Sequence, residues 1–307
     1  MPILVGTASW TDKSLIGCGR FYPKEASSAE ARLRYYAAQF PMVEVDSSYY
    51  AMPSATNAQL WAERTPADFV FNVKAFRLFT GHQTSPTVLP KDIQVALAAV
   101  PALASKKVFY YREVPPEIRE ELWRRFLGAL APLQLAGKLR AVHFQFAPWV
   151  LRNRDGHAHV AHCVQMMQGS TVAVMVAVEF RNRTWFDDEH AAQTLGFERE
   201  LGVVHVVVDG PQGFANSVPA VWEVTHPDLA IVRMHGRNSE TWNQKGLTAS
   251  SDRFNYDYSE NELAELATNI RQLATKVRTV QTVFNNNFED QGQRNARTLM
   301  GLLKSKA

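Results

Sequence analysis

Short runs rich in β-branched and apolar residues recur along the whole chain, and segments with helical periodicity lie between them. Strands that alternate with helices are parallel as a rule, because each crossover returns the chain to the same end of the sheet. Eight such repeats predict an α/β fold closed into a (β/α)8, or TIM-like, barrel. The expected strands are Ile3–Ser9, Met42–Ser48, Phe69–Ala75, Ala141–Ala147, Ala173–Arg181, Val203–Asp209, Leu229–His235 and Thr279–Asn286.

An open, doubly wound sheet is the alternative architecture for the same alternation. The sequence contains nothing similar to the glycine-rich phosphate fingerprint of that fold, so the barrel is favoured. The segment from Phe76 to Arg140 is long for one crossover and holds two helical patterns, Asp92–Leu103 and Pro116–Leu130. We therefore expect residues 1–307 to form one domain with an elaborated loop, about 77–140, after the third strand.

The composition is that of an ordinary globular protein, with 46% apolar and 21% charged residues. The formal net charge is only +3, so binding to nucleic acid would require a local basic patch. The two cysteines, Cys18 and Cys163, are too few for a disulfide scaffold and are typical of a reducing compartment. No signal peptide or membrane span is expected, and we predict a cytoplasmic protein.

Alternation along each strand predicts which side chains face the barrel interior. In Met42–Ser48, Val43 and Val45 face the helices, so Glu44 and Asp46 face inward. Barrel interiors are normally filled by Val, Ile and Leu, and burying a charge is costly unless it is paired. A polar set at the C-terminal strand ends therefore predicts a functional site. The same alternation places inward Lys74, His143, Gln145, Glu179, Arg181, His205, Asp209, Arg233, His235 and Asn285.

The cationic members of this set favour an anionic ligand, because arginine forms bidentate hydrogen bonds with phosphate or carboxylate. Lys74, Arg181 and Arg233 are the expected clamp, and Arg183 and Arg237 lie just beyond the strands. The further expected ligand-binding residues are Asp46, Gln145, Trp185, Asn285 and Asn286. The candidate catalytic residues are Glu179 or Asp209 as general base, His235 as general acid, and Glu44.

A divalent metal is the only cofactor that the composition of the predicted site raises. Histidines and carboxylates on the inward face would supply enough ligands, but no His-x-His or His-x-x-x-His spacing occurs there. The sequence therefore leaves metal binding open and names no metal ligands.

Ordered motifs along almost the whole chain resemble domain of unknown function family 72, the YecE-like family. This resemblance implies a TIM-like barrel and no established activity. Asp46 departs from it, since Asn often stands at that position in the family. The motifs that carry the resemblance are Gly6–Trp10, Phe21–Pro23, Val43–Tyr50, Phe71–Lys74, Phe144–Pro148, Val178–Trp185, Val208–Asp209, Val232–Arg237 and Phe284–Asn286.

Three functions remain open from the sequence. The favoured one is an enzyme that acts on a phosphate-bearing or other anionic small molecule, with phosphoester hydrolysis as the leading reaction. A glycoside hydrolase would use Glu44 and Glu179 as its two carboxylates. A non-catalytic nucleic-acid-binding module would use a basic rim of Arg183, Arg237, Lys245 and Arg253.

Overall fold

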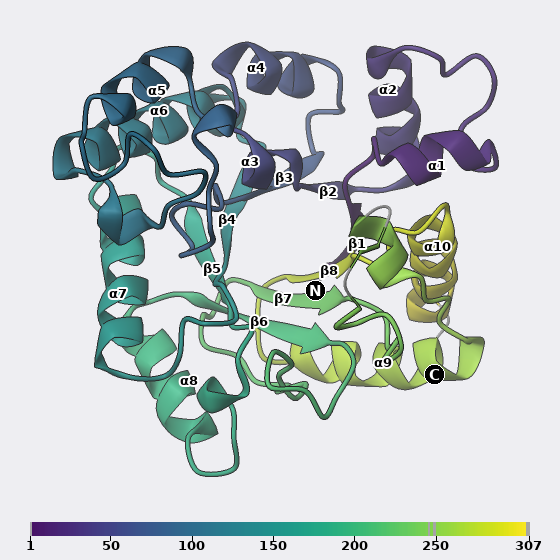
Figure 1. Ribbon diagram of the computed structural model, residues 1–307. Helices are drawn as coiled ribbons and strands as arrows, with labels where there is room; N and C mark the ends of the chain where they lie inside the picture. The colour runs from purple at the N-terminus through teal and green to yellow at the C-terminus, as the bar shows by residue number, and fades with distance from the viewer. Residues whose placement is uncertain (1, 245, 248–249, 305–307) are drawn as a thin grey trace.

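Eight parallel strands close into a barrel in chain order, as the alternation predicted. The computed structural model describes residues 2–244, 246–247 and 250–304. Helices surround the strands, which gives a TIM barrel (Figure 1). The strands are β1 (Ile3–Ala8), β2 (Met42–Val45), β3 (Val70–Lys74), β4 (Leu139–Gln145), β5 (Met175–Glu179), β6 (Val204–Asp209), β7 (Ala230–Met234) and β8 (Val280–Phe284).

The crossovers between strands carry α-helices and four short 3-10 helices within the described residues. The α-helices are α1 (Lys13–Cys18), α2 (Ala29–Gln39), α3 (Ser47–Tyr50), α4 (Ala55–Glu63), α5 (Lys91–Ala98), α6 (Pro116–Leu135), α7 (Arg154–Gln168), α8 (Ala191–Glu200), α9 (Glu260–Ala274) and α10 (Gln291–Lys304). The 3-10 helices are η1 (Pro86–Val88), η2 (Tyr111–Glu113), η3 (Arg183–Trp185) and η4 (Ser250–Phe254).

The long segment after β3 has the two helices that the sequence predicted, with different ends. The first is shorter than expected, because α5 ends at Ala98. The second is longer, since α6 continues to Leu135 and contains Pro132 within its last turns. Between them, Phe109 forms an antiparallel bridge with Thr84. The bridge joins two parts of this segment, which therefore folds back on itself between β3 and β4.

The strands separate two apolar regions. The larger lies between the outer faces of the strands and the surrounding helices. A small second cluster of Ala8, Met42 and Val283 lies inside the barrel. Inside the barrel as well, the buried amide of Asn72 donates to Gln281 at 2.7 Å. The apolar filling is thus confined to part of the interior, and the rest is polar.

The predicted facing of β6 is wrong. We expected His205 and Asp209 to face inward, but Val208 pairs with Arg233, whose guanidinium lies inside the barrel. Neighbours across parallel strands share a face, so His205 and Asp209 face the helices. His205 Nδ1 accordingly lies 3.0 Å from the carboxylate of Glu198 on α8. β6 is apolar on both faces, and its alternation therefore gave no reliable direction.

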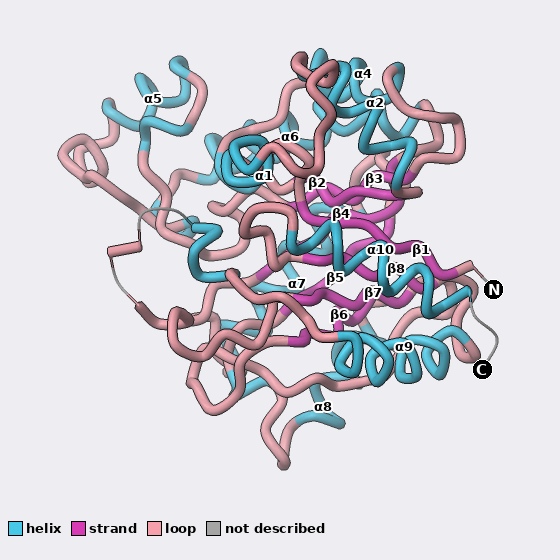
Figure 2. The backbone as a smooth tube through the Cα atoms, turned by 90° about the vertical axis from the view of Figure 1, so that its right-hand side faces the viewer, coloured by secondary structure: helices cyan, strands magenta, loops and turns pink. Residues whose placement is uncertain are grey.

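Both ends of the described chain lie at one end of the barrel, and the longest loops extend from the other (Figure 2). Because β1 begins at the end of the barrel where the chain termini lie, the long loops surround the C-terminal ends of the strands. This is the end at which TIM-barrel enzymes bind their substrates. No helix in the described part of the chain is both long and apolar enough to cross a membrane.

Candidate functional site

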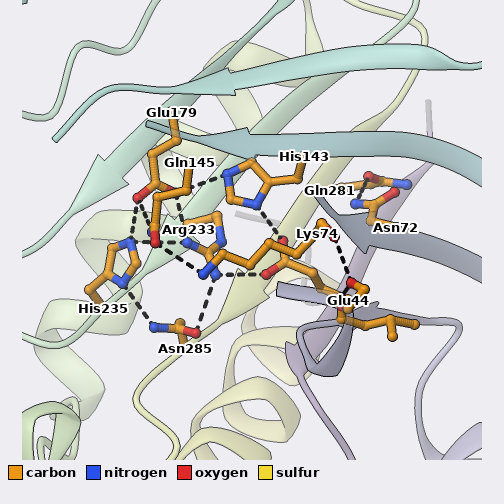
Figure 3. A network of polar contacts seen from close by, with 12 residues as sticks. Glu44, Asn72, Lys74, His143, Gln145, Glu179, Arg233, His235, Gln281 and Asn285 are labelled. Atoms are coloured by element: carbon orange, nitrogen blue, oxygen red, sulfur yellow. Dashed lines mark hydrogen bonds and ion pairs between the residues drawn. The ribbon is translucent and has the colours of Figure 1, made fainter. Parts of the chain in front are cut away.

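A buried arginine joins two buried carboxylates at the centre of the barrel (Figure 3). Arg233 on β7 contacts Glu44 of β2 through Nη2 at 2.6 Å and Glu179 of β5 through Nη1 at 2.7 Å. His143 of β4 lies between the same carboxylates, with Nδ1 at 3.1 Å from Glu44 and Nε2 at 3.2 Å from Glu179. The inward facing predicted for Glu44, Glu179 and Arg233 is therefore confirmed, and each charge is paired as burial requires.

Every partner of the Glu179 carboxylate is supplied by the barrel itself. Its Oε1 accepts hydrogen bonds from Gln145 at 2.6 Å and Arg181 at 2.9 Å, besides the contact of Oε2 with Arg233. Burial alone would raise the pKa of Glu179, but Arg233 and His235 outweigh it and hold that pKa well below its usual range. A carboxylate with such a low pKa has little affinity for a proton and is a poor general base at neutral pH.

Asn285 fixes the hydrogen-bonding state of His235. The amide oxygen of Asn285 accepts from Arg233 at 3.2 Å, so its nitrogen faces His235 Nδ1 at 2.9 Å. His235 Nδ1 then accepts a hydrogen bond, and the proton on Nε2 points to Glu179 at 3.1 Å. Burial lowers the pKa of His235 to about 3, and the ring is neutral. This geometry makes His235 a positioning residue for Glu179 and does not favour the expected role as general acid.

A cavity of about 700 Å³ opens above this network at the C-terminal strand ends. Five of the expected site residues line it, and the remaining walls come mostly from loops. The expected residues are Asp46, Lys74, Gln145, Arg181 and Asn285, and the aromatic wall residues are Tyr49, Tyr50, His82, Trp149, Trp242 and Phe254. The cavity is thus polar at its floor and aromatic around its sides, a combination typical of ligand sites.

Lys74 and Asp46 line the cavity, and both have pKa values shifted toward neutrality. Burial and, to a smaller extent, nearby Arg233 lower the pKa of Lys74 to about 8, against the opposing effect of the carboxylates. Burial raises the pKa of Asp46 to about 6, with Lys74 opposing the rise. Lys74 Nζ donates to Gln145 Oε1 at 3.0 Å and lies 4.4 Å from the centre of the Tyr49 ring. An acid and a base whose pKa values are both shifted toward neutrality, as for Lys74 and Asp46, are common where proton transfer takes place.

Arg181 extends the network into the cavity. Its Nη1 donates to Glu179, and its guanidinium lies over the Trp242 ring, 4.9 Å from the ring centre. The side chain is 13% exposed. One face of the guanidinium is therefore held by the protein while the group still borders the cavity.

The comparisons with known proteins agree with this architecture. A family model described as "Protein of unknown function DUF72" matches residues 4–307. The chain belongs to the DUF72 family. It is 31% identical over 303 residues to the UPF0759 protein YunF of Bacillus subtilis, which covers 98% of this chain and 94% of that protein.

Solved structures of DUF72 family proteins have the same fold as this chain. A crystal structure of one from Enterococcus faecalis superposes with a TM-score of 0.78 at 24% identity, over 99% of this chain and 96% of the other. One from Thermotoga maritima gives a TM-score of 0.74 at 25% identity, over 99% and 100%. The resemblance seen in the sequence motifs is thereby confirmed, and these relatives establish the fold.

Two of the expected site residues in this DUF72 protein pair with each other outside the cavity. Asp209 accepts hydrogen bonds from Arg237 at 2.8 and 3.1 Å and from the Tyr258 hydroxyl at 2.5 Å. The Tyr258 oxygen also accepts from the backbone of Gly236 at 2.9 Å. Arg237 additionally contacts Glu262 of α9 at 3.1 Å. These groups hold the loop after β7 onto α9, and neither Asp209 nor Arg237 lines the cavity.

Three further expected ligand-binding residues also lie away from the cavity. Trp185 is fully buried, donates from Nε1 to the Val150 carbonyl at 2.8 Å and stacks on Phe180 with ring centres 3.9 Å apart. Asn286 is buried and donates to the side chain of Asn295 at 2.7 Å. Arg183 is exposed and is absent from the cavity wall. Arg183 and Trp185 lie in η3 and Asn286 follows β8, and their side chains turn to the surface or the core.

Several cavity residues were not predicted from the sequence. His82, Asn216 and Phe254 lie in loops or in η4, where no periodicity indicates which side chain faces the barrel. His82 Nδ1 lies 2.9 Å from the Thr80 hydroxyl, and burial lowers the pKa of His82 to about 3. Its ring is therefore neutral and contributes a polar edge to the wall without adding charge.

The residues of the network do not form a metal centre. Among residues 2–244, 246–247 and 250–304, no three His, Cys, Asp or Glu side chains are grouped so as to hold a metal ion. Glu44 and Glu179 would be the natural carboxylate ligands, yet both converge on Arg233. The guanidinium occupies the place at which a cation would bridge them.

Proposed function

We propose that this protein is an enzyme that binds a small phosphate-bearing molecule in the cavity above the Arg233 network. The observation that carries the proposal is the placement of charge. Lys74 and Arg181 border the cavity, whereas Glu44 and Glu179 lie beneath it and are already bonded to Arg233. An entering anion therefore meets two cationic donors, and the charges of Glu44 and Glu179 are neutralised by Arg233, which leaves Asp46 as the carboxylate that borders the cavity.

Phosphoester hydrolysis is the reaction that these groups would serve. Water attacks phosphorus and the bond to the leaving oxygen breaks. The Asp46 carboxylate accepts the proton of the attacking water, and the Lys74 ammonium gives its proton to the leaving oxygen. Arg181 stabilises the charge on the phosphoryl oxygens. The pKa values of about 6 for Asp46 and about 8 for Lys74 supply the ionised base and the protonated acid between those pH values.

The two alternatives from the sequence have less support. In a glycoside hydrolase, Glu44 and Glu179 would flank the scissile bond, but both hold the same guanidinium and neither lines the cavity. Of the basic rim, Arg183 is exposed, Arg237 is paired with Asp209, and Arg253 borders the cavity. Lys245 lies outside the described residues.

The proposal is tested by calorimetric titration of inorganic phosphate and phosphorylated sugars, and by hydrolysis of an aryl phosphate. Arg181→Gln and Lys74→Gln should each weaken phosphate binding by roughly 10- to 100-fold, the worth of a charge-assisted hydrogen bond. Arg183→Gln, an exposed arginine two residues away, is the matched control and should bind as the wild type does. Asp46→Asn should keep binding and lose hydrolysis.

Binding should also weaken as the pH rises through about 8, because Lys74 then loses its charge. Equal phosphate affinity in Arg181→Gln, Lys74→Gln and the wild type would exclude the anion site. Binding without any hydrolysis would keep the site and reject the reaction.

A further inference from the structure

A second cavity of about 680 Å³ lies beside the first, on the segment that follows β3 and the start of α7. The aromatic residues Tyr110, Tyr111 and Trp149 line it, together with Val150 and Leu151. It is comparable in size to the first cavity, and the proposed chemistry uses none of its residues.

Trp149 is the wall that the two cavities share. Its indole nitrogen donates to the Gly81 carbonyl at 2.8 Å, and its ring lies edge-on to His82 of the first cavity and to Tyr110 of the second. The side chain is held in place although it is 51% exposed. A large aromatic ring that is fixed yet exposed is typical of a surface that contacts a ligand.

The polar groups of the second cavity suit an uncharged partner. Arg112 and Asp155 are exposed side chains of opposite charge on its rim, and Asn153 supplies an amide. At its inner side, His159 Nε2 is buried without a hydrogen-bond partner among the described residues. Because this nitrogen is covered by the protein, the polar groups that a ligand can reach are those of the rim. Burial lowers the pKa of His159 to about 4, so this ring offers no charge.

We infer that the second cavity is a subsite for a neutral sugar ring, and that the ligand spans both cavities across Trp149. The aromatic rings would cover the apolar face of the sugar, and the rim side chains Arg112, Asn153 and Asp155 would bind its hydroxyls. The inference rests on the proposed anion site and narrows its substrate to a phosphate-bearing molecule with at least two sugar rings.

The test measures the gain in affinity from a second sugar ring. Calorimetric titrations compare glucose 6-phosphate with trehalose 6-phosphate and lactose 1-phosphate. The two disaccharide phosphates should bind about tenfold more tightly, for one additional stacked ring. Tyr110→Ala should remove this gain while leaving the affinity for glucose 6-phosphate unchanged. Tyr110→Phe keeps the ring and should keep the gain.

A second variant guards against misfolding of the first. Asp155→Asn changes an exposed rim carboxylate, and it should reduce the disaccharide gain severalfold without changing the monosaccharide affinity. Equal affinity for mono- and disaccharide phosphates in the wild type would overturn the subsite. Preferential binding of adenosine 5′-phosphate that depends on Tyr110 would overturn the sugar assignment. If glucose 6-phosphate itself does not bind, the anion site fails, and the inference fails with it.

Discussion

Arg233 shows how the role of one residue depends on neighbours that the sequence does not place beside it. Alternation in β7 predicted correctly that this side chain faces inward. It suggested a ligand clamp, because an arginine at a strand end is a common anion donor. The structure instead surrounds the guanidinium with Glu44 of β2, Glu179 of β5 and Asn285, which directly follows β8. Those contacts arise only when the barrel closes.

Arg233→Met should therefore destabilise the fold, because it leaves two buried carboxylates facing each other. Loss of one partner from a buried ion pair costs about 3–5 kcal/mol. Urea denaturation followed by circular dichroism measures the loss. Arg183→Met removes an exposed arginine and should change the stability by less than about 0.5 kcal/mol. Adding Glu44→Gln to the Arg233 variant should recover part of the loss, and an unchanged midpoint in Arg233→Met would contradict this account.

Lys74 should cost the protein stability at neutral pH. Its pKa is lowered by burial to about 8 in the folded protein, from an ordinary value near 10.5, so the protonated form favours the unfolded chain. Lys74→Met should raise the denaturation midpoint below pH 8. That gain should shrink between pH 8 and about 10.5, where the unfolded chain also loses its proton. Thermal unfolding at pH 6.5, 8 and 10.5 compares the midpoints of Lys74→Met and the wild type. A difference that grows with pH would contradict the lowered pKa of Lys74.

At the scale of the strand, alternation predicted facing wherever one face is polar and the other apolar. β2, β4 and β5 have that pattern, and Glu44, His143 and Glu179 meet inside the barrel. β6 lacks it, because valines occupy both of its faces, and its two polar residues were assigned to the wrong side. Strand ends were also predicted too late. The strand predicted at Met42–Ser48 is β2, which ends at Val45 because the residues that follow lead into α3.

The pairing of β1 with β2 depends on a glycine. Gly6 pairs with Met42, and a Cβ on Gly6 would lie 2.2 Å from the Met42 carbonyl oxygen. Gly6→Ala should force the two strands apart and cost about 3 kcal/mol or more. Gly17→Ala is the matched control, since nothing lies within 4 Å of its added Cβ, and its effect should stay within about 1 kcal/mol. Equal stability of the two variants would show that the pairing of β1 with β2 tolerates a side chain at position 6.

At the scale of the molecule, the barrel could be predicted because alternation of strands and helices is repeated over the whole chain. The floor of the site followed from it, since Lys74 and Gln145 are strand residues with a defined facing and Asn285 directly follows β8. The walls could not be predicted in the same way. His82 reaches the cavity from a loop and Phe254 from η4, and the paths of both segments depend on tertiary packing. Trp149 separates two cavities that no local pattern indicates.

The saturated hydrogen bonding of Glu179 has a consequence for how such a protein would acquire a new ligand. The hydrogen bonds of the floor come from residues on the strands or within two residues of their ends, so its geometry is set before any ligand arrives and does not rely on the longer loops. Loop residues such as Trp149 and Phe254 then decide which molecules fit above it. Exchanging those loops between barrels with the same floor would alter selectivity and leave the floor residues in their positions. This scaffold is therefore a favourable starting point for directed evolution.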